Sequence, residues 1–532
     1  MGTRIVSRIF IGVMVACIVL SGCTKEVDTG GVQRLVVAVT SEADTLDPHK
    51  TISGSCNFVM REIYDPLVTK DNEGRFQPGL AESWVISDDG TTYRFTLRKD
   101  VKFTDGTQFD ANAVKFTFDR LMDPETAAPA QGQVGPLESV TVIDEYTVEF
   151  KHKDPYAPFL QNLSGAYLSI ICPTAVEEWG KDYGQHPVGT GPFILENWVP
   201  GSHILLVKNP DWVNIYPWSE HDGPVLIDEL EIRTIKDEQT LLAAMETNEV
   251  HVAIPPRTEV SRLAKDDRFQ IITDDNSATI GYLEINIKNP PMDELAVRKA
   301  VGYAINRKEI ITASYYDLAK EATVPLPTGL QGYSDEIGQT YGFTHDPGKA
   351  KELLADAGFQ DSDGDGIVER DGKPFEVLYL TWEDPIARKI AEVVQAQMKA
   401  VGIKVNIETY DWATLVNKQP EAKWHFEYMS WGWQDPVVIS MMFKDYKDMG
   451  IYDIEEELPE LFEVVYKIGV TPHPEQRVKY IHQALEMELE NAIFVPLMSP
   501  YYVSCISSKV EGFKFGPFGR WSYVDCSFKT QK

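Results

Sequence analysis

Residues 78–95 read Pro-Gly-Leu-Ala-Glu-Ser-Trp-Val-Ile-Ser-Asp-Asp-Gly-Thr-Thr-Tyr-Arg-Phe. Two runs rich in β-branched and aromatic residues flank the Asp89-Gly90 pair, which is typical of a tight turn between antiparallel strands. A second such turn, Asp105-Gly106, follows. The stretch 83–150 is therefore predicted to be a meander of short antiparallel strands, interrupted by a helix over 112–121 that Asp110 can cap.

The sequence on both sides of this meander predicts a mixed helix and strand chain. Residues 32–39 form an apolar, β-branched run typical of a strand, and 237–249 has the apolar spacing of an amphipathic helix. A break at Asn289-Pro290-Pro291 is where we place a crossing between lobes. Beyond it, helices are predicted at 293–304, 347–357 and 386–400, and a strand at 403–407. This alternation favours an α/β lobe.

The first 22 residues have the pattern of an export signal. Arg4 and Arg8 precede the apolar run 9–20, which is too short to span a bilayer as a helix. Leu20-Ser21-Gly22-Cys23 looks like a bacterial lipobox, so Cys23 is predicted to be lipidated and to anchor the mature chain at the membrane. Residues 1–22 are thus a lipoprotein signal peptide, and 23–31 form a lipidated tether. Cleavage without lipidation is the alternative.

Composition excludes several classes of function. The chain has 532 residues, which suits two lobes, and a formal net charge of −31. Such a charge repels phosphate backbones and anionic lipids, so neither nucleic-acid binding nor peripheral membrane binding is expected. Its 43% hydrophobic content is sufficient for packed cores.

Cysteine usage indicates neither a zinc ribbon nor a redox motif, because no Cys-x-x-Cys occurs. Cys56, Cys172, Cys505 and Cys526 allow three pairings, of which Cys505 with Cys526 is the one we favour in an oxidising compartment.

The strongest indication of family comes from several short motifs that follow one another along the chain in a fixed order. They are Leu-Asp-Pro at 46–48, Tyr-Asp-Pro-Leu at 64–67, the 78–95 stretch, Gly-Thr-Gly-Pro-Phe at 189–193, Val-Arg-Lys-Ala at 297–300 and Asp-Pro-Gly-Lys-Ala at 346–350. Together they closely resemble the oligopeptide/dipeptide-type family of bacterial extracellular solute-binding proteins, family 5, which serve ATP-driven importers. The resemblance covers nearly the whole mature chain.

The resemblance implies a two-lobed α/β fold of the periplasmic-binding-protein type, with an inserted small subdomain and two crossings between lobes. Lobe I would comprise 32–286 and 501–532, with the subdomain at approximately 75–200, and lobe II would comprise 287–500. A monomer is expected, located outside the cytoplasm. It would capture a small organic ligand in the cleft between lobes and deliver it to the permease of an ABC importer.

The best candidate for the ligand site is Trp431-Gly432-Trp433-Gln434-Asp435-Pro436. In the family a Trp here is followed by an Asp that pairs with the amino group of a peptide. The present stretch is shorter, so Asp435 aligns with a second family acid and the first is missing. Trp382 and Trp412 either line the cleft or pack in the core. Ser53, Gly54 and Ser55 are expected to face the ligand from the other lobe.

Asp361, Asp363 and Asp365 have the spacing of a calcium loop, but position 12 is Gly372 where a bidentate Glu is required. Glu369 or Asp371 could compensate. The alternative is a pair of acidic turns in a hairpin, and we predict no metal and no cofactor.

Three classes of function remain open. The leading one is a binding protein for an oligopeptide or dipeptide, with an oligosaccharide, nickel or haem as alternative ligands. An enzyme is not expected, because the His-Glu-x-x-His, Gly-x-Ser-x-Gly and phosphate-loop motifs are absent. A signalling receptor or an adhesin is the third. The sequence leaves ligand identity, ligand length and envelope type open.

Overall fold

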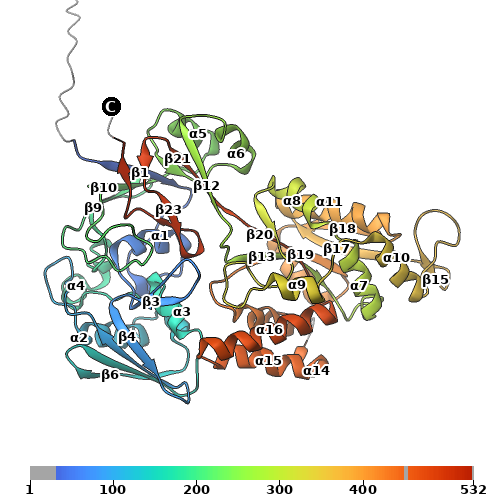
Figure 1. Cartoon of the computed structure of the whole chain (residues 1–532), viewed down its shortest axis with the longest axis horizontal. Helices are drawn as coiled ribbons and strands as arrows, with labels where there is room; N and C mark the ends of the chain where they lie inside the picture. Colours follow the sequence, from blue (N-terminus) through green and yellow to red (C-terminus); the bar gives the residue numbers. More distant parts are fainter. Residues whose placement is uncertain (1–30, 449–452, 530–532) are drawn as a thin grey trace, which may run out of the picture.

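The computed structural model describes residues 31–448 and 453–529. Within these ranges the chain forms two bodies side by side (Figure 1). The predicted signal peptide, Cys23 and most of the tether lie outside the described residues. Among the helices in the described ranges, none is both long and apolar enough to cross a bilayer.

Lobe I is built on a mixed seven-stranded sheet. Its strands, in spatial order, are β12 (Phe269–Asp274), β21 (Tyr502–Ser507), β11 (Val252–Ala253), β1 (Arg34–Val39), β10 (Glu229–Thr234), β9 (His203–Lys208) and β8 (Phe193–Val199). The central strand β1 has four buried residues in succession and pairs in parallel with both β10 and β11. The lobe also contains helices α1 (Gly54–Ile63), α5 (Glu238–Glu246) and α6 (Arg257–Leu263).

The inserted subdomain contains the predicted antiparallel strands. Its four-stranded antiparallel sheet has the order β4 (Ala81–Ile86), β5 (Thr92–Leu97), β7 (Thr147–His152) and β6 (Leu137–Asp144). Because β7 lies between β5 and β6, the sheet is not the predicted meander, in which consecutive strands are neighbours. Helix α2 (Ala111–Met122) begins after Asp110, whose carboxylate accepts from the backbone N–H groups of Asn112 and Ala113 at 2.9 Å each. Both the strands and the capped helix are thus confirmed.

Lobe II is built on a six-stranded sheet. Its strands, in spatial order, are β14 (Ala319–Glu321), β20 (Phe494–Pro500), β13 (Thr279–Ile285), β19 (Phe426–Gly432), β17 (Glu376–Trp382) and β18 (Lys404–Tyr410). A βαβ unit agrees with the predicted α/β lobe: β17 and β18 are parallel and joined by α11 (Pro385–Ala400). The other main helices are α7 (Leu295–Ala304), α8 (Arg307–Tyr315), α10 (Pro347–Asp356), α13 (Val438–Asp448), α15 (Pro459–Val470) and α16 (Pro474–Asn491).

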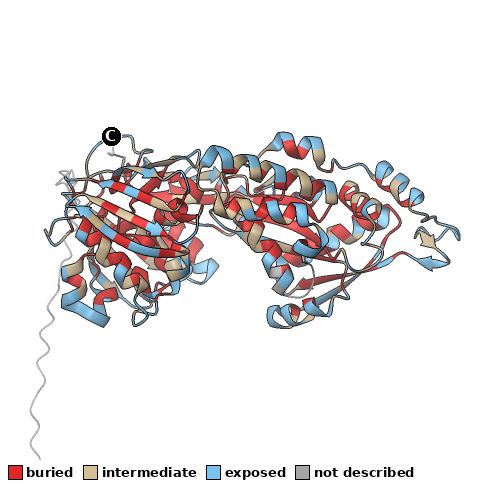
Figure 2. Ribbon diagram, turned by 90° about the horizontal axis from the view of Figure 1, so that it is seen from below, coloured by how far each residue is buried: buried red, intermediate tan, exposed pale blue. Residues whose placement is uncertain are grey.

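Each lobe has its own core. Figure 2 shows the buried residues gathered within the two bodies, and the largest buried cluster in lobe I is separate from the two clusters of lobe II, one of which also includes Phe518 of lobe I. Independent cores allow the bodies to move relative to one another. The predicted two-lobed α/β fold is confirmed.

The chain crosses between the lobes twice. The first crossing lies at 275–278, between β12 and β13, and the second lies at Tyr501, between β20 and β21. The predicted boundary after residue 286 was therefore too late. The alternating residues of β13 predict a strand, which we assigned to lobe I. In the structure β13 pairs with β19 and β20, so it belongs to the sheet of lobe II. The break at Asn289-Pro290-Pro291 is a turn within lobe II.

The favoured disulfide between Cys505 and Cys526 is absent, because Cys56, Cys172, Cys505 and Cys526 are all buried free thiols. Cys505 lies in β21 within a cluster formed with α5 and α6, whereas Cys526 belongs to the main core of lobe I. Proximity in sequence did not bring the two sulfurs together because they pack in different clusters.

Candidate functional site

A cavity of about 1220 Å³ lies between the two lobes. Lobe I lines it with the end of β1, one face of α1, the segment 254–258 and the segment 518–521. Lobe II lines it with the end of α8 (313–316), the start of α11 (384–389) and Gln434. Because both lobes contribute side chains, a ligand bound there would contact both.

The lobe I wall is organised by α1. Gly54, Phe58 and Arg61 follow one another at helical spacing, so they lie on one face of the helix, and all three line the cavity. The C-terminal end of α1 is held by close packing: a Cβ added at Gly191 would lie 2.6 Å from the carbonyl oxygen of Ile63. The Gly-Thr-Gly-Pro motif thus positions the helix that faces the cleft.

A buried aspartate connects two of the sequence motifs beneath this wall. The Asp65 carboxylate accepts from Thr190 Oγ1 at 3.1 Å and from Trp212 Nε1 at 3.2 Å. Burial raises the pKa of Asp65 to about 6. The Tyr-Asp-Pro-Leu and Gly-Thr-Gly-Pro motifs therefore act as scaffold rather than as ligand contacts.

Apolar side chains remain exposed on both walls. Ile254 in lobe I is 62% exposed, and Tyr316 in lobe II is 52% exposed. Tyr316 also has a positive φ of 56° directly after α8, a conformation that is costly for a large side chain. Exposed apolar surface within a cleft marks a binding site.

The lobe I side of the cavity carries a group of three charged residues, Arg61, Glu62 and Arg520, with two cations and one acid. Arg520 donates to Tyr216 Oη at 2.6 Å and lies 3.8 Å from Glu62. Burial raises the pKa of Glu62 to about 7. Burial, followed by the neighbouring charge of Arg520, lowers the pKa of Arg61 to about 10. Arg61 therefore stays protonated at neutral pH.

Of the three serine and glycine positions predicted to face the ligand, Gly54 and Ser55 line the cavity. Ser53 precedes α1 and does not line it, but its hydroxyl lies 2.8 Å from that of Ser55. A Cβ added at Gly54 would meet no atom within 4 Å, so the start of α1 is open to the cleft.

The four predicted tryptophans lie outside the lining of the cavity. Trp382 stacks on Tyr428 at 5.7 Å and meets Trp412 edge-on at 5.4 Å, with Trp412 51% exposed. Trp431 is partly buried at the end of β19, and Trp433 is 38% exposed. Between Trp433 and Asp435, Gln434 does reach the cavity.

Asp435 is buried in an ion pair within lobe II, contrary to its predicted role as an anchor for a ligand ammonium group. Its carboxylate receives two hydrogen bonds from Arg477, at 2.8 and 2.5 Å, and one from the backbone N–H of Val437 at 2.8 Å. Both side chains are at most 4% exposed. The carboxylate is already neutralised, so the structure does not support this role.

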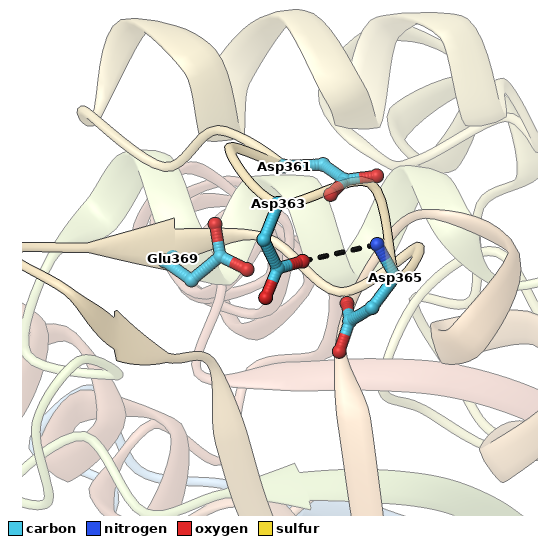
Figure 3. Close-up of side chains that lie close together, drawn as sticks. All are labelled: Asp361, Asp363, Asp365 and Glu369. Atoms are coloured by element: carbon cyan, nitrogen blue, oxygen red, sulfur yellow. Dashed lines mark hydrogen bonds between the residues drawn. The ribbon is translucent and has the colours of Figure 1, made fainter.

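The acidic loop lies far from the cleft, next to β15 (Glu369–Arg370) at the end of lobe II most distant from lobe I (Figure 1). Carboxylate oxygens of Asp361, Asp363, Asp365 and Glu369 lie within 4.8 Å of one another (Figure 3). Each also accepts backbone N–H bonds within the loop. These bonds explain the loop as the pair of acidic hairpin turns that the sequence allowed, and we assign it no ligand.

Arg61, Tyr316 and Arg520 are cleft residues that sequence reasoning missed. Arg61 lies in an ordinary helical segment, and which face of α1 points to the cleft depends on contacts far along the chain. The available signal for Arg61 was the presence of a cationic residue among the apolar side chains of α1.

A two-lobed α/β fold with a large ligand-sized cavity between the lobes defines a binding protein of the kind that closes over a small solute. Comparison of the sequence with models of known protein families identifies the family. The model described as "Bacterial extracellular solute-binding proteins, family 5 Middle" matches residues 75–450, so the chain belongs to this family. It is therefore a binding protein and not an enzyme.

Relatives and solved structures cover nearly the whole chain. It is 28% identical over 513 residues to the glutathione-binding protein GsiB of Salmonella paratyphi A, covering 93% of this chain and 94% of that protein. A dipeptide-binding protein of Pseudoalteromonas sp. SM9913, in complex with Met-Leu, is 26% identical with a TM-score of 0.67 and coverage of 93% and 100%. The periplasmic murein tripeptide binding protein MppA, in its unliganded open form, is 20% identical with a TM-score of 0.77 and coverage of 93% and 97%.

Proposed function

We propose that this protein is the lipid-anchored substrate-binding component of an ABC importer, and that it captures a short peptide in the interlobe cleft for delivery to the permease. The observation that carries the proposal is the cavity of about 1220 Å³ lined by both lobes, with exposed apolar side chains on each wall. A di- or tripeptide fits such a volume. The glutathione, dipeptide and murein tripeptide named for the relatives support the same ligand class.

The alternative ligands have less support. Trp382, Trp412, Trp431 and Trp433, which suggested sugar stacking, do not line the cavity, although Trp198 and Trp521 do. The lining contains one histidine, His203, which disfavours a nickel site built from several imidazoles. The monomeric state remains a prediction.

Lobe closure follows from a ligand that touches both walls, because contacts with both lobes favour the closed state over the open one.

Two measurements test the proposal. Mass spectrometry of ligand released from purified protein identifies the class of solute, and calorimetry with dipeptides, tripeptides, cello-oligosaccharides and Ni²⁺ ranks the candidates. Micromolar or tighter binding of peptides, together with a smaller radius of gyration by small-angle scattering, is expected. Binding restricted to sugars or nickel would overturn the peptide assignment.

A further inference from the structure

Arg61 is a cation in the cleft without a bonded partner. Its side chain is partly buried, lines the cavity, and makes no hydrogen bond or ion pair with any residue in the ranges 31–448 and 453–529. Its backbone carbonyl, in contrast, accepts from Arg520 at 2.9 Å. Arg61 lies in the last turn of α1, where the helix dipole favours a positive charge. The dipole provides no acceptor for the guanidinium N–H groups, so these donors stay unpaired.

The surroundings of Arg61 do not neutralise its charge. The adjacent acid in the sequence, Glu62, lies 3.8 Å from Arg520 and forms its ion pair with that cation. A partly buried, uncompensated guanidinium is costly, and such groups are ordinarily paired. An anionic group on the bound ligand would supply the missing partner.

A carboxylate is the anionic group that a peptide ligand carries. The planar guanidinium can form two parallel hydrogen bonds with it. The acids that line the cavity, Glu42, Glu62, Glu238 and Asp384, are balanced by the further cations Lys236, Arg257, Lys389 and Arg520, so the lining does not repel an anionic group.

The geometry points to a specificity residue: we propose that Arg61 binds a carboxylate of the solute, so the cleft selects short peptides that carry a free carboxylate. This inference rests on the proposed peptide-binding function and names the recognised group. The carboxylate has two sources, the peptide's C-terminus and an acidic side chain, and the probes must separate them.

The experiment uses the full mature chain and three defined probes: Ala-Ala-Ala, its C-terminal amide, and Ala-Glu-Ala amide. Affinities are measured by calorimetry for the wild type, Arg61→Gln and Arg61→Lys. Arg94→Gln is the matched control, because Arg94 pairs with Glu149 on the subdomain sheet, outside the cavity lining, and its loss changes net charge equally.

For the wild type, Ala-Ala-Ala should bind roughly 30- to 1,000-fold more tightly than its amide if the C-terminus is recognised. Tight binding restricted to Ala-Glu-Ala amide would assign the acidic side chain instead. Arg61→Gln should abolish the preference, Arg61→Lys should retain part of it, and Arg94→Gln should keep it in full.

Two failures are distinguishable. Equal wild-type affinity for the acid and amide probes, with no change in Arg61→Gln, would overturn the role of Arg61 but leave peptide binding intact. Binding of none of the probes would overturn the proposed function and this assignment with it. The comparison of acid and amide on the wild type requires no folded variant.

Discussion

Arg477 holds both carboxylate oxygens of Asp435 inside lobe II, at a point where the subdomain of lobe I touches it. Its Nε also donates to the carbonyl of Ile468 at 2.8 Å. Next to this pair the backbone N–H of Ala157 in the subdomain donates to the carbonyl of Gly469 at 2.9 Å. The ion pair therefore shapes the surface on which the two lobes meet.

Breaking this ion pair is expected to lower the stability of the fold without removing a ligand contact. Asp435→Asn should lower the free energy of unfolding by about 3–5 kcal/mol, because it leaves the Arg477 charge buried and unpaired. The exposed pair Arg98–Asp100 offers the control, and Asp100→Asn should change stability by less than about 1 kcal/mol. Denaturant unfolding measures both.

The same variant tests the earlier interpretation of Asp435. N-acetylation of a peptide ligand should weaken binding to the wild type and to a folded Asp435→Asn protein by the same factor. A penalty for acetylation in the wild type alone would restore Asp435 as the amine anchor.

Two buried carboxyl groups should make stability depend on pH. Glu284 and Glu427 lie directly opposite on β13 and β19, at most 2% exposed, and burial together with their mutual repulsion raises the pKa of Glu284. The folded protein then holds a proton that the unfolded chain releases above about pH 4.5. The free energy of unfolding contributed by this pair should therefore fall as pH rises from 4.5 and level off above the raised pKa.

Glu427→Gln isolates this effect. The variant removes the like charge and should show a weaker fall in stability than the wild type between pH 5 and pH 8. Glu408→Gln, an exposed position in the same sheet, should follow the wild type. Parallel curves for the wild type and Glu427→Gln would contradict the assignment.

Gly189 is expected to tolerate no side chain. A Cβ there would lie 2.1 Å from the carbonyl oxygen of Ile63 at the end of α1, a contact that forces backbone movement. Gly189→Ala should cost about 1–3 kcal/mol or more. Gly132→Ala, where no atom lies within 4 Å, should leave the thermal midpoint nearly unchanged, and equal midpoints for both variants would refute the packing argument.

Membrane attachment should depend on Cys23. Because stable anchoring requires several acyl chains, Cys23→Ser should move the protein from the membrane fraction to the soluble extracytoplasmic fraction. Immunoblots of fractionated cells, with Cys56→Ser as the control, measure this. Full retention of the Cys23→Ser protein in membranes would refute the lipobox.

Local sequence signals predicted the elements well. Asp110 caps α2, and the patterns of 386–400 and 403–407 predicted α11 and β18, because capping and periodicity act over a few residues. The site depends on longer distances. Asp435 meets a partner 42 residues away, and no local pattern marks Arg477 as that partner.

The first crossing was misplaced for a related reason. The alternation in β13 shows that it is a strand but not which sheet it joins, and the answer depends on β19 and β20, well over a hundred residues later in the chain. Arg61 was missed because only the docking of α1 decides which of its faces is exposed to the cleft.

The position of β21 sets an order for folding during synthesis. All six strands of the lobe II sheet come from the continuous stretch 279–500, so that sheet can assemble as soon as residue 500 is available. The lobe I sheet cannot, since β21 (Tyr502–Ser507) lies between β11 and β12 and is among the last strands made. Lobe II is therefore able to fold before lobe I, whose two segments flank it in the sequence. A chain that is still being extended can form at most one of the two walls of the cleft.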